Sequence, residues 1–201
     1  MSVTVFLGGT FNPFHICHNQ MAAALNALPE IDKVYIMPDK IPPHKECVFL
    51  APDCDRIEMC RLAAADFKKA EVLLIEFERD GKSYTFDTVT QLKKRFPDTR
   101  FFMACGGDMI ASLNRWYRWE ELIKEIGFYA FRREGEKGFD EAVDKLREKG
   151  AEIRVINTPI AQVSSTEIRQ KLRNGENTEL LPKNIQEYIN KKELYYECDN
   201  S

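Results

Sequence analysis

The chain has 201 residues, of which 44% are hydrophobic and 30% charged, and its formal net charge is −3. This length and hydrophobic content predict a single domain over residues 1–201 with a sizeable core. The acidic balance argues against nucleic acid as a partner, because binding its phosphates needs a basic surface, and no apolar run approaches the ~20 residues that cross a membrane.

The first predicted element is a buried parallel strand over residues 3–7, which are apolar and β-branched. It runs into Gly8 and Gly9, and apolar residues from Met21 onward then recur at helical spacing. A strand, a glycine loop and a helix start together expose backbone N–H groups at the positive end of a helix dipole. We therefore expect this loop to bind a phosphate, which the two glycines allow to approach closely.

Two of the three histidines, His15 and His18, lie at the mouth of this loop, on one side of a helical first turn. His44 follows the next predicted strand, over residues 34–37. In a doubly wound sheet the loops after the carboxyl ends of the strands line one crevice, so all three histidines can meet there. Ordinary surface or helix-capping histidines are the alternative interpretation.

Apolar runs and helical patterns alternate along the rest of the chain. We predict a helix capped by Asp53 or Asp55, a third and central strand over residues 72–77, and a helix that opens near Thr85. Further strands are predicted over residues 100–105, 128–131 and 153–156. Residues from about 160 to 192 form a small helical C-terminal subregion. The alternation predicts an α/β fold with a doubly wound, mostly parallel sheet.

The fourth predicted strand repeats the first junction, because it runs into Gly106, Gly107 and Asp108 and then into a helix. From the residues alone, Asp108 can be the N-cap of that helix. Residues 164–169, Ser-Ser-Thr-Glu-Ile-Arg, offer competing N-caps at a further helix start.

The six cysteines form no C-x-x-C pair and, with only three histidines, give no zinc spacing. We therefore predict no metal held by protein side chains. Reduced thiols and the lack of a secretory leader favour a cytoplasmic location.

Residues 8–15, Gly-Gly-Thr-Phe-Asn-Pro-Phe-His, together with His18, resemble the first signature of the nucleotidyltransferase superfamily, and residues 164–169 resemble its second. The segments 43–45 (Pro-His-Lys), 84–88 (Tyr-Thr-Phe-Asp-Thr) and 107–108 (Gly-Asp), with Trp116, narrow the resemblance to the bacterial nicotinate mononucleotide adenylyltransferase family, from about residue 3 to 188. Two departures stand out: Cys17 replaces a family glycine, and Glu134 follows Arg133 where the family usually has proline.

The resemblance implies a Rossmann-like nucleotidyltransferase fold and an enzyme of NAD biosynthesis. Its reaction transfers the AMP moiety of ATP to nicotinate mononucleotide and gives nicotinate adenine dinucleotide and pyrophosphate. The attacking phosphate oxygen is already ionised, so direct in-line attack needs no general base and no covalent intermediate. The protein positions the phosphates and stabilises charge on the α-phosphate. Mg²⁺ is expected to bind mainly through the ATP phosphates.

The same resemblance implies roles for individual residues. The expected catalytic residues are His15, His18 and Arg169. The expected ATP site comprises Gly8, Gly9, Thr10, His15, His18, Gly106, Asp108, Ser165, Thr166 and Arg169. The expected mononucleotide site comprises Phe11, Asn12, His44, Lys45, Tyr84, Thr85 and Trp116. Trp116 would stack on the pyridine ring, although a core tryptophan is an equal alternative from the residues alone.

Other functions stay open at this point. A sister adenylyltransferase acting on nicotinamide mononucleotide or phosphopantetheine is the nearest alternative, and a non-catalytic nucleotide-binding regulator, suggested by Cys17, is another. The expected partners are the small molecules ATP and nicotinate mononucleotide, and a homo-oligomer is allowed.

Overall fold

The computed structural model of the chain describes residues 2–41, 50–133, 135–158 and 160–196. Its centre is a six-stranded sheet with the order β3-β2-β1-β4-β5-β6, in which every neighbouring pair is parallel. The strands are β1 (Ser2–Gly9), β2 (Lys33–Pro38), β3 (Ala70–Val72), β4 (Thr99–Gly106), β5 (Gly127–Phe131) and β6 (Ile153–Ile156). The chain therefore winds outward from β1 in one direction and from β4 in the other, which confirms the predicted doubly wound α/β fold.

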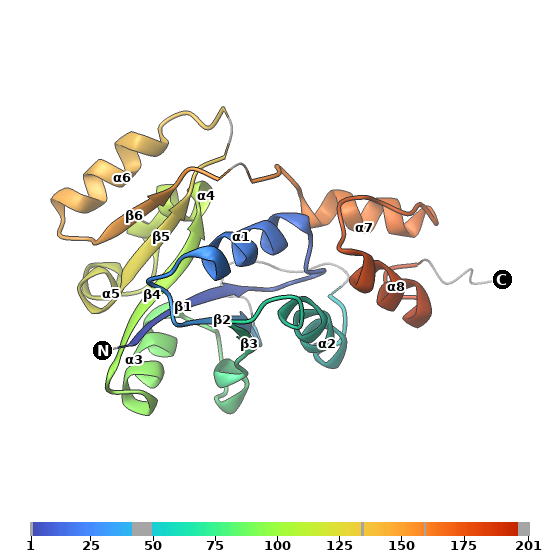
Figure 1. Cartoon of the computed structure of the whole chain (residues 1–201), viewed down its shortest axis with the longest axis horizontal. Helices are drawn as coiled ribbons and strands as arrows, with labels where there is room; N and C mark the ends of the chain where they lie inside the picture. Colours follow the sequence, from blue (N-terminus) through green and yellow to red (C-terminus); the bar gives the residue numbers. More distant parts are fainter. Residues whose placement is uncertain (1, 42–49, 134, 159, 197–201) are drawn as a thin grey trace.

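Helices cover both faces of this sheet (Figure 1). They are α1 (Ile16–Ala27), α2 (Asp53–Ala64), α3 (Thr85–Arg95), α4 (Gly107–Ser112), α5 (Trp119–Glu125), α6 (Phe139–Glu148), α7 (Ser165–Arg173) and α8 (Lys183–Lys192). The side chains of β1 alternate between the faces: Val5 and Leu7 pack in a core with α1, α2, α7 and α8, whereas Phe6 packs in a second core with α3 to α6. The period-2 pattern of β1 thus divides the interior into two cores.

The predicted third central strand over residues 72–77 is wrong. Only Ala70–Val72 pairs with β2, and this short strand lies at one edge of the sheet. The chain then turns into a 3-10 helix, η1 (Ile75–Glu78), in which Ile75 is buried in the second core. Residues 72–77 are mostly apolar, but Glu76 interrupts them. Its buried carboxylate lies outside the sheet and accepts a hydrogen bond from the Thr88 hydroxyl at 2.7 Å.

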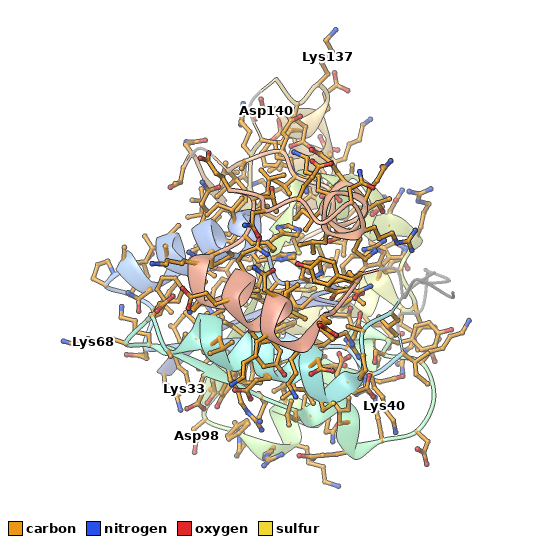
Figure 2. All side chains as sticks on the ribbon, turned by 90° about the vertical axis from the view of Figure 1, so that its right-hand side faces the viewer. Lys33, Lys40, Lys68, Asp98, Lys137 and Asp140 are labelled. Atoms are coloured by element: carbon orange, nitrogen blue, oxygen red, sulfur yellow. The ribbon has the colours of Figure 1, made fainter. Side chains whose placement is uncertain are left out.

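The helices α7 and α8 extend beyond one end of the sheet, on the side where the chain ends and away from its N-terminus (Figure 1). Among the residues that the structure describes, no helix has the length and apolar character needed to span a membrane. Charged side chains such as Lys68, Asp98 and Lys137 project outward (Figure 2). Charges of both signs therefore lie on the outside of the molecule, whereas a small set of polar side chains, including His15 and Arg56, is buried.

Candidate active site

A cleft of about 1060 Å³ opens where β1 and β4 separate. These strands pair from Ser2 with Thr99 up to Phe6 with Met103, after which β1 continues along β2 and β4 along β5. Neighbouring parallel strands whose connections lead in opposite directions leave a crevice at their carboxyl ends, where open α/β sheets bind ligands. The fold therefore places this cleft at the position that the glycine loop predicted.

Every predicted site residue that the structure describes lines this one cleft. They are Gly8, Gly9, Thr10, Phe11, Asn12, His15, His18, Tyr84, Thr85, Gly106, Asp108, Trp116, Ser165, Thr166 and Arg169. The remaining two, His44 and Lys45, lie outside the described residues, as does Glu134. The structure thus brings together segments that are more than a hundred residues apart in sequence.

The two histidines of the loop are stacked, with 3.7 Å between their ring centroids. His15 occupies the N-cap position of α1, so the capping interpretation and the site interpretation both describe it. Its backbone N–H donates to Nδ1 of His18 at 3.3 Å. A ring nitrogen that accepts carries no proton, so His18 in this arrangement holds its proton on Nε2. Phe11 and Phe14 flank the His18 ring, with centroids at 4.9 and 5.2 Å.

The start of α7 supplies a second set of donors. Ser164 is the N-cap, and its hydroxyl accepts from the Thr166 backbone N–H at 3.2 Å. The Arg169 guanidinium donates to the main-chain oxygen of Asn12 at 2.8 Å and to the Thr166 hydroxyl at 3.2 Å. Arginine carries five N–H donors in a planar fork, so after these two contacts others can reach an anion in the cleft.

Thr10 is held from behind by a buried arginine. Arg56, which is fully buried, donates to the Thr10 main-chain oxygen at 2.7 Å and pairs with Asp39 at 3.4 Å and with Asp53 at 2.6 Å. The Thr10 hydroxyl donates to the other Asp39 oxygen at 3.0 Å. Because that hydrogen is used by Asp39, the backbone N–H of Thr10 is the better donor for a phosphate. Asp53 and Asp55 do not cap α2, whose N-cap is Pro52.

The second glycine junction lies across the cleft from α1. A Cβ atom on Gly106 would approach Asp108 Oδ1 to 2.8 Å, so a larger residue there would require the Asp108 side chain to move. Asp108 is not the N-cap of α4, because Gly106 holds that position. Instead, Asp108 forms an ion pair with Arg133 at 3.2 Å. Arg133 was not among the predicted site residues, although its place after the fifth strand pointed to this edge of the sheet.

Cys17 also lines the cleft, and its side chain is buried. Burial raises the pKa of its thiol, Arg133 opposes the rise and Asp108 adds to it. The thiol is therefore neutral near neutral pH and lies close enough to the Asp108–Arg133 pair to feel both charges. A neutral, buried thiol occupies space in the cleft without offering a strong donor or a nucleophile.

We expect Cys17→Gly to keep activity or raise it up to a few-fold, because the substitution enlarges the cleft beside Asp108. The glycine sits in the first turn of α1 and costs about 0.5–1 kcal/mol of stability through the backbone, to which the loss of the buried Cys17 side chain adds. Turnover and the KM for ATP measure the effect, and Cys54→Ser, at an exposed cysteine, is the control. A collapse of activity in Cys17→Gly alone would mean that the thiol has a positive role.

The start of α3 forms another wall. Tyr84 is its N-cap and Thr85 its first residue, so backbone N–H groups of the first turn have no partner within the helix. Arg79 supports this start from behind by donating to the Thr88 hydroxyl and to the Tyr84 main-chain oxygen. Glu76 completes the support by accepting from Thr88. This arrangement can receive an anionic group such as a carboxylate.

Aromatic rings border the same wall. Trp116 lines the cleft and also packs against the second core, so the stacking and core interpretations are compatible. Tyr117, with 49% of its surface exposed, lies beside Tyr84 with 4.9 Å between ring centroids. Flat apolar surfaces next to helix-start donors suit a planar ring that carries an acid group.

The sequence did not reveal the polar residues that contact the glycine loop. Arg56 and Asp39 contact Thr10, and the Tyr195 hydroxyl contacts the Asn12 side chain. Their signal in the sequence is weak, because each looks like an ordinary residue of a helix, a loop or a tail. Within the described residues, no group of three or more histidine, cysteine or acidic side chains is placed to hold a metal ion.

The cytidylyltransferase-like family model matches residues 6–171. Proteins of Exiguobacterium sibiricum and Halalkalibacterium halodurans, both named "Probable nicotinate-nucleotide adenylyltransferase", are 38% and 40% identical; each alignment covers 94% of this chain, and 96% and 89% of the relative. Among solved structures, Plasmodium falciparum nicotinic acid mononucleotide adenylyltransferase complexed with NaAD is similar in fold, with a TM-score of 0.81 at 21% identity, over 97% of this chain and 98% of that one.

Proposed function

The chain belongs to the cytidylyltransferase-like family and, within it, to the nicotinate-nucleotide adenylyltransferases, and on this premise we propose that it transfers the AMP moiety of ATP to nicotinate mononucleotide in NAD biosynthesis. The products are nicotinate adenine dinucleotide and pyrophosphate. The relatives' shared name and their coverage of nearly the whole chain support this reaction. The reduced thiols of the described cysteines agree with the cytoplasmic location that we also propose.

One observation carries the mechanism: imidazole, guanidinium and helix-start donors from α1 and α7 converge on a single cleft. The nucleophile is a phosphate oxygen that is ionised at neutral pH, so the reaction needs no general base. It needs two anions held in line and a stabilised α-phosphate as negative charge builds there. A site rich in fixed donors meets this requirement.

On the ATP side, we assign to His18 the contact with the α-phosphate. His18 lines the cleft, and its ring holds its proton on Nε2 because Nδ1 accepts from the His15 N–H. Arg169, with Ser165 and Thr166 at the start of α7, would hold the β- and γ-phosphates. Gly106 and Asp108 would meet the ribose and base of adenosine. These assignments follow the family's motif and agree with the position of each residue in the cleft.

Mg²⁺ fits this site as an ion brought by the triphosphate. The acidic side chains of the cleft are engaged elsewhere: Asp39 with Arg56, Asp108 with Arg133 and Glu76 with Thr88. Phosphate oxygens and water would therefore supply most of its ligands, which Mg²⁺ favours. When bound, the ion neutralises part of the phosphate charge.

On the acceptor side, we propose that the nicotinate carboxylate binds at the start of α3, beside Tyr84 and Thr85. The Thr85 backbone N–H is the proposed donor, because the Tyr84 N–H already donates to the Lys82 main-chain oxygen at 3.0 Å. Trp116 would stack on the pyridine ring. Phe11 and Asn12 border the same region, and His44 and Lys45 would meet the phosphate of the mononucleotide. N–H donors at a helix start stabilise a negatively charged carboxylate more than a neutral amide. This wall of the cleft therefore favours nicotinate mononucleotide over nicotinamide mononucleotide.

The deciding experiment measures pyrophosphate release with ATP and Mg²⁺, supplied with nicotinate mononucleotide, nicotinamide mononucleotide or phosphopantetheine. We expect release with the acid to exceed release with either alternative by at least tenfold. A reaction without acceptor corrects for ATP hydrolysis. Equal rates with the acid and the amide would remove the substrate assignment and keep the reaction, whereas no release with any acceptor would favour a nucleotide-binding regulator.

A further inference from the structure

The tail after α8 turns back onto the active-site loop through two unusual backbone positions. Glu193 and Tyr195 have φ values of 53° and 70°, in the left-handed region. Neither is glycine, so each costs roughly 1–2 kcal/mol that other contacts must offset. A strained turn of this kind persists only where the surrounding structure holds the following side chain firmly in place.

The side chain held by this turn is Tyr195. Its ring packs against the core that contains α1, α2, α7 and α8. Its hydroxyl hydrogen-bonds the side-chain oxygen of Asn12 at 2.8 Å, across 183 residues of sequence. Burial raises the pKa of this hydroxyl, so it stays protonated, and an amide oxygen can only accept. Tyr195 is therefore the donor in this contact.

Asn12 joins three separate parts of the chain. Besides the Tyr195 hydroxyl, its side-chain oxygen accepts from the Ala51 backbone N–H at 3.1 Å. Its main-chain oxygen accepts from Arg169 at 2.8 Å. Asn12 is buried, so these contacts are shielded from water and strongly constrain its position. A movement of Asn12 would therefore displace an acceptor of the Arg169 guanidinium, which we assign to the phosphates.

We propose that Tyr195 is a positioning residue for adenylyl transfer. Its hydroxyl holds the side chain of Asn12, so that the main-chain oxygen of Asn12 keeps Arg169 directed into the cleft. The inference rests on the proposed function, since it concerns the same site. Tyr195 acts through Asn12 and Arg169 and not on substrate. The tail thereby contributes to turnover although it lies behind the loop, outside the cleft.

The chain offers a matched comparison in the next residue. The Tyr196 hydroxyl hydrogen-bonds Asn190 Oδ1 at 2.9 Å, an exposed contact between the tail and α8. Tyr195→Phe and Tyr196→Phe each remove one hydroxyl and keep the ring. They differ in what the hydroxyl holds: the active-site loop in one case, and the tail's own helix in the other.

The experiment compares both variants with the unaltered protein in pyrophosphate release and in thermal unfolding. We expect Tyr195→Phe to lower kcat about tenfold while the KM values change less than threefold and Tm falls by only a few degrees, because a misplaced Arg169 affects the transition state more than substrate binding. Tyr196→Phe should match the unaltered protein. In an Asn12→Ala background, Tyr195→Phe should cause no further loss, since its partner is gone.

Hydrogen exchange gives a readout that needs no activity. The Ala51 N–H exchanges more slowly while Asn12 accepts from it, and we expect Tyr195→Phe to speed its exchange about tenfold relative to Tyr196→Phe. Unchanged kcat and unchanged exchange in Tyr195→Phe would overturn the proposal, as would a loss that adds fully to that of Asn12→Ala. Failure of the unaltered protein to release pyrophosphate would instead count against the proposed function, and exchange would still decide the role of Tyr195.

Discussion

His18→Ala is expected to lower kcat by about two to three orders of magnitude while ATP binding weakens only a few-fold. His18 lines the cleft and holds its proton on Nε2, because its Nδ1 accepts from the His15 N–H. A donor directed at the α-phosphate gains most when negative charge builds there, so its loss raises the barrier more than it weakens the ground-state complex. Steady-state kinetics and calorimetric ATP binding separate the two effects.

The control for packing is His18→Phe. It keeps a ring between Phe11, Phe14 and His15, the aromatic neighbours of His18, but it removes the donor. We expect it to match the alanine variant in kcat and to exceed it in stability. Weaker ATP binding with an unchanged kcat in both variants would contradict a transition-state role for His18.

Arg56→Met is expected to lower the free energy of unfolding by about 3 kcal/mol, the lower end of the cost of removing one partner from a buried charge pair. Arg56 is fully buried and contacts Thr10, Asp39 and Asp53. The lower end applies because Asp53 is half exposed, which weakens its share. Turnover should also fall, because the Thr10 main-chain oxygen loses the donor that orients the loop.

Urea unfolding of Arg56→Met and of Arg61→Met compares a buried and an exposed arginine on the same helix, α2. Arg61 pairs with Glu58 at 3.4 Å but is 58% exposed, so its loss should cost less than ~1 kcal/mol. Similar losses for both variants would mean that the contacts behind the loop matter no more than a surface pair. Arg56→Lys adds a further test, since lysine keeps the charge and cannot reproduce the planar fork.

Much of the fold could be predicted because its signals are local. The strands β1, β2, β4, β5 and β6 appear as short apolar runs ended by glycine, proline or charge, and the helices show their spacing. The edge strand β3 could not be predicted correctly, since a run of apolar residues does not reveal whether a neighbouring strand exists on both sides. The predicted N-caps of α2 and α4 were also wrong, because the N-caps of these helices are Pro52 and Gly106, which make no side-chain capping hydrogen bond.

The candidate site divides in the same way. The position of Gly8, His15 and Arg169 in the cleft could be predicted, because these residues lie in compact sequence motifs. The residues that hold them could not, because the contact of Arg56 with Thr10 spans 46 residues and that of Tyr195 with Asn12 spans 183. Such partners are brought together only by the completed fold.

The strand lengths at the two edges of the sheet have a consequence for self-association. β3 has three residues and β6 has four, whereas the central β1 and β4 each have eight. Few main-chain groups are therefore available along either margin to accept a strand from another molecule. Charged side chains reinforce this protection: Glu71 in β3 pairs with Lys33, and Arg154 in β6 contacts Glu152. Aggregation by continuing the sheet from one molecule into the next is disfavoured at both margins.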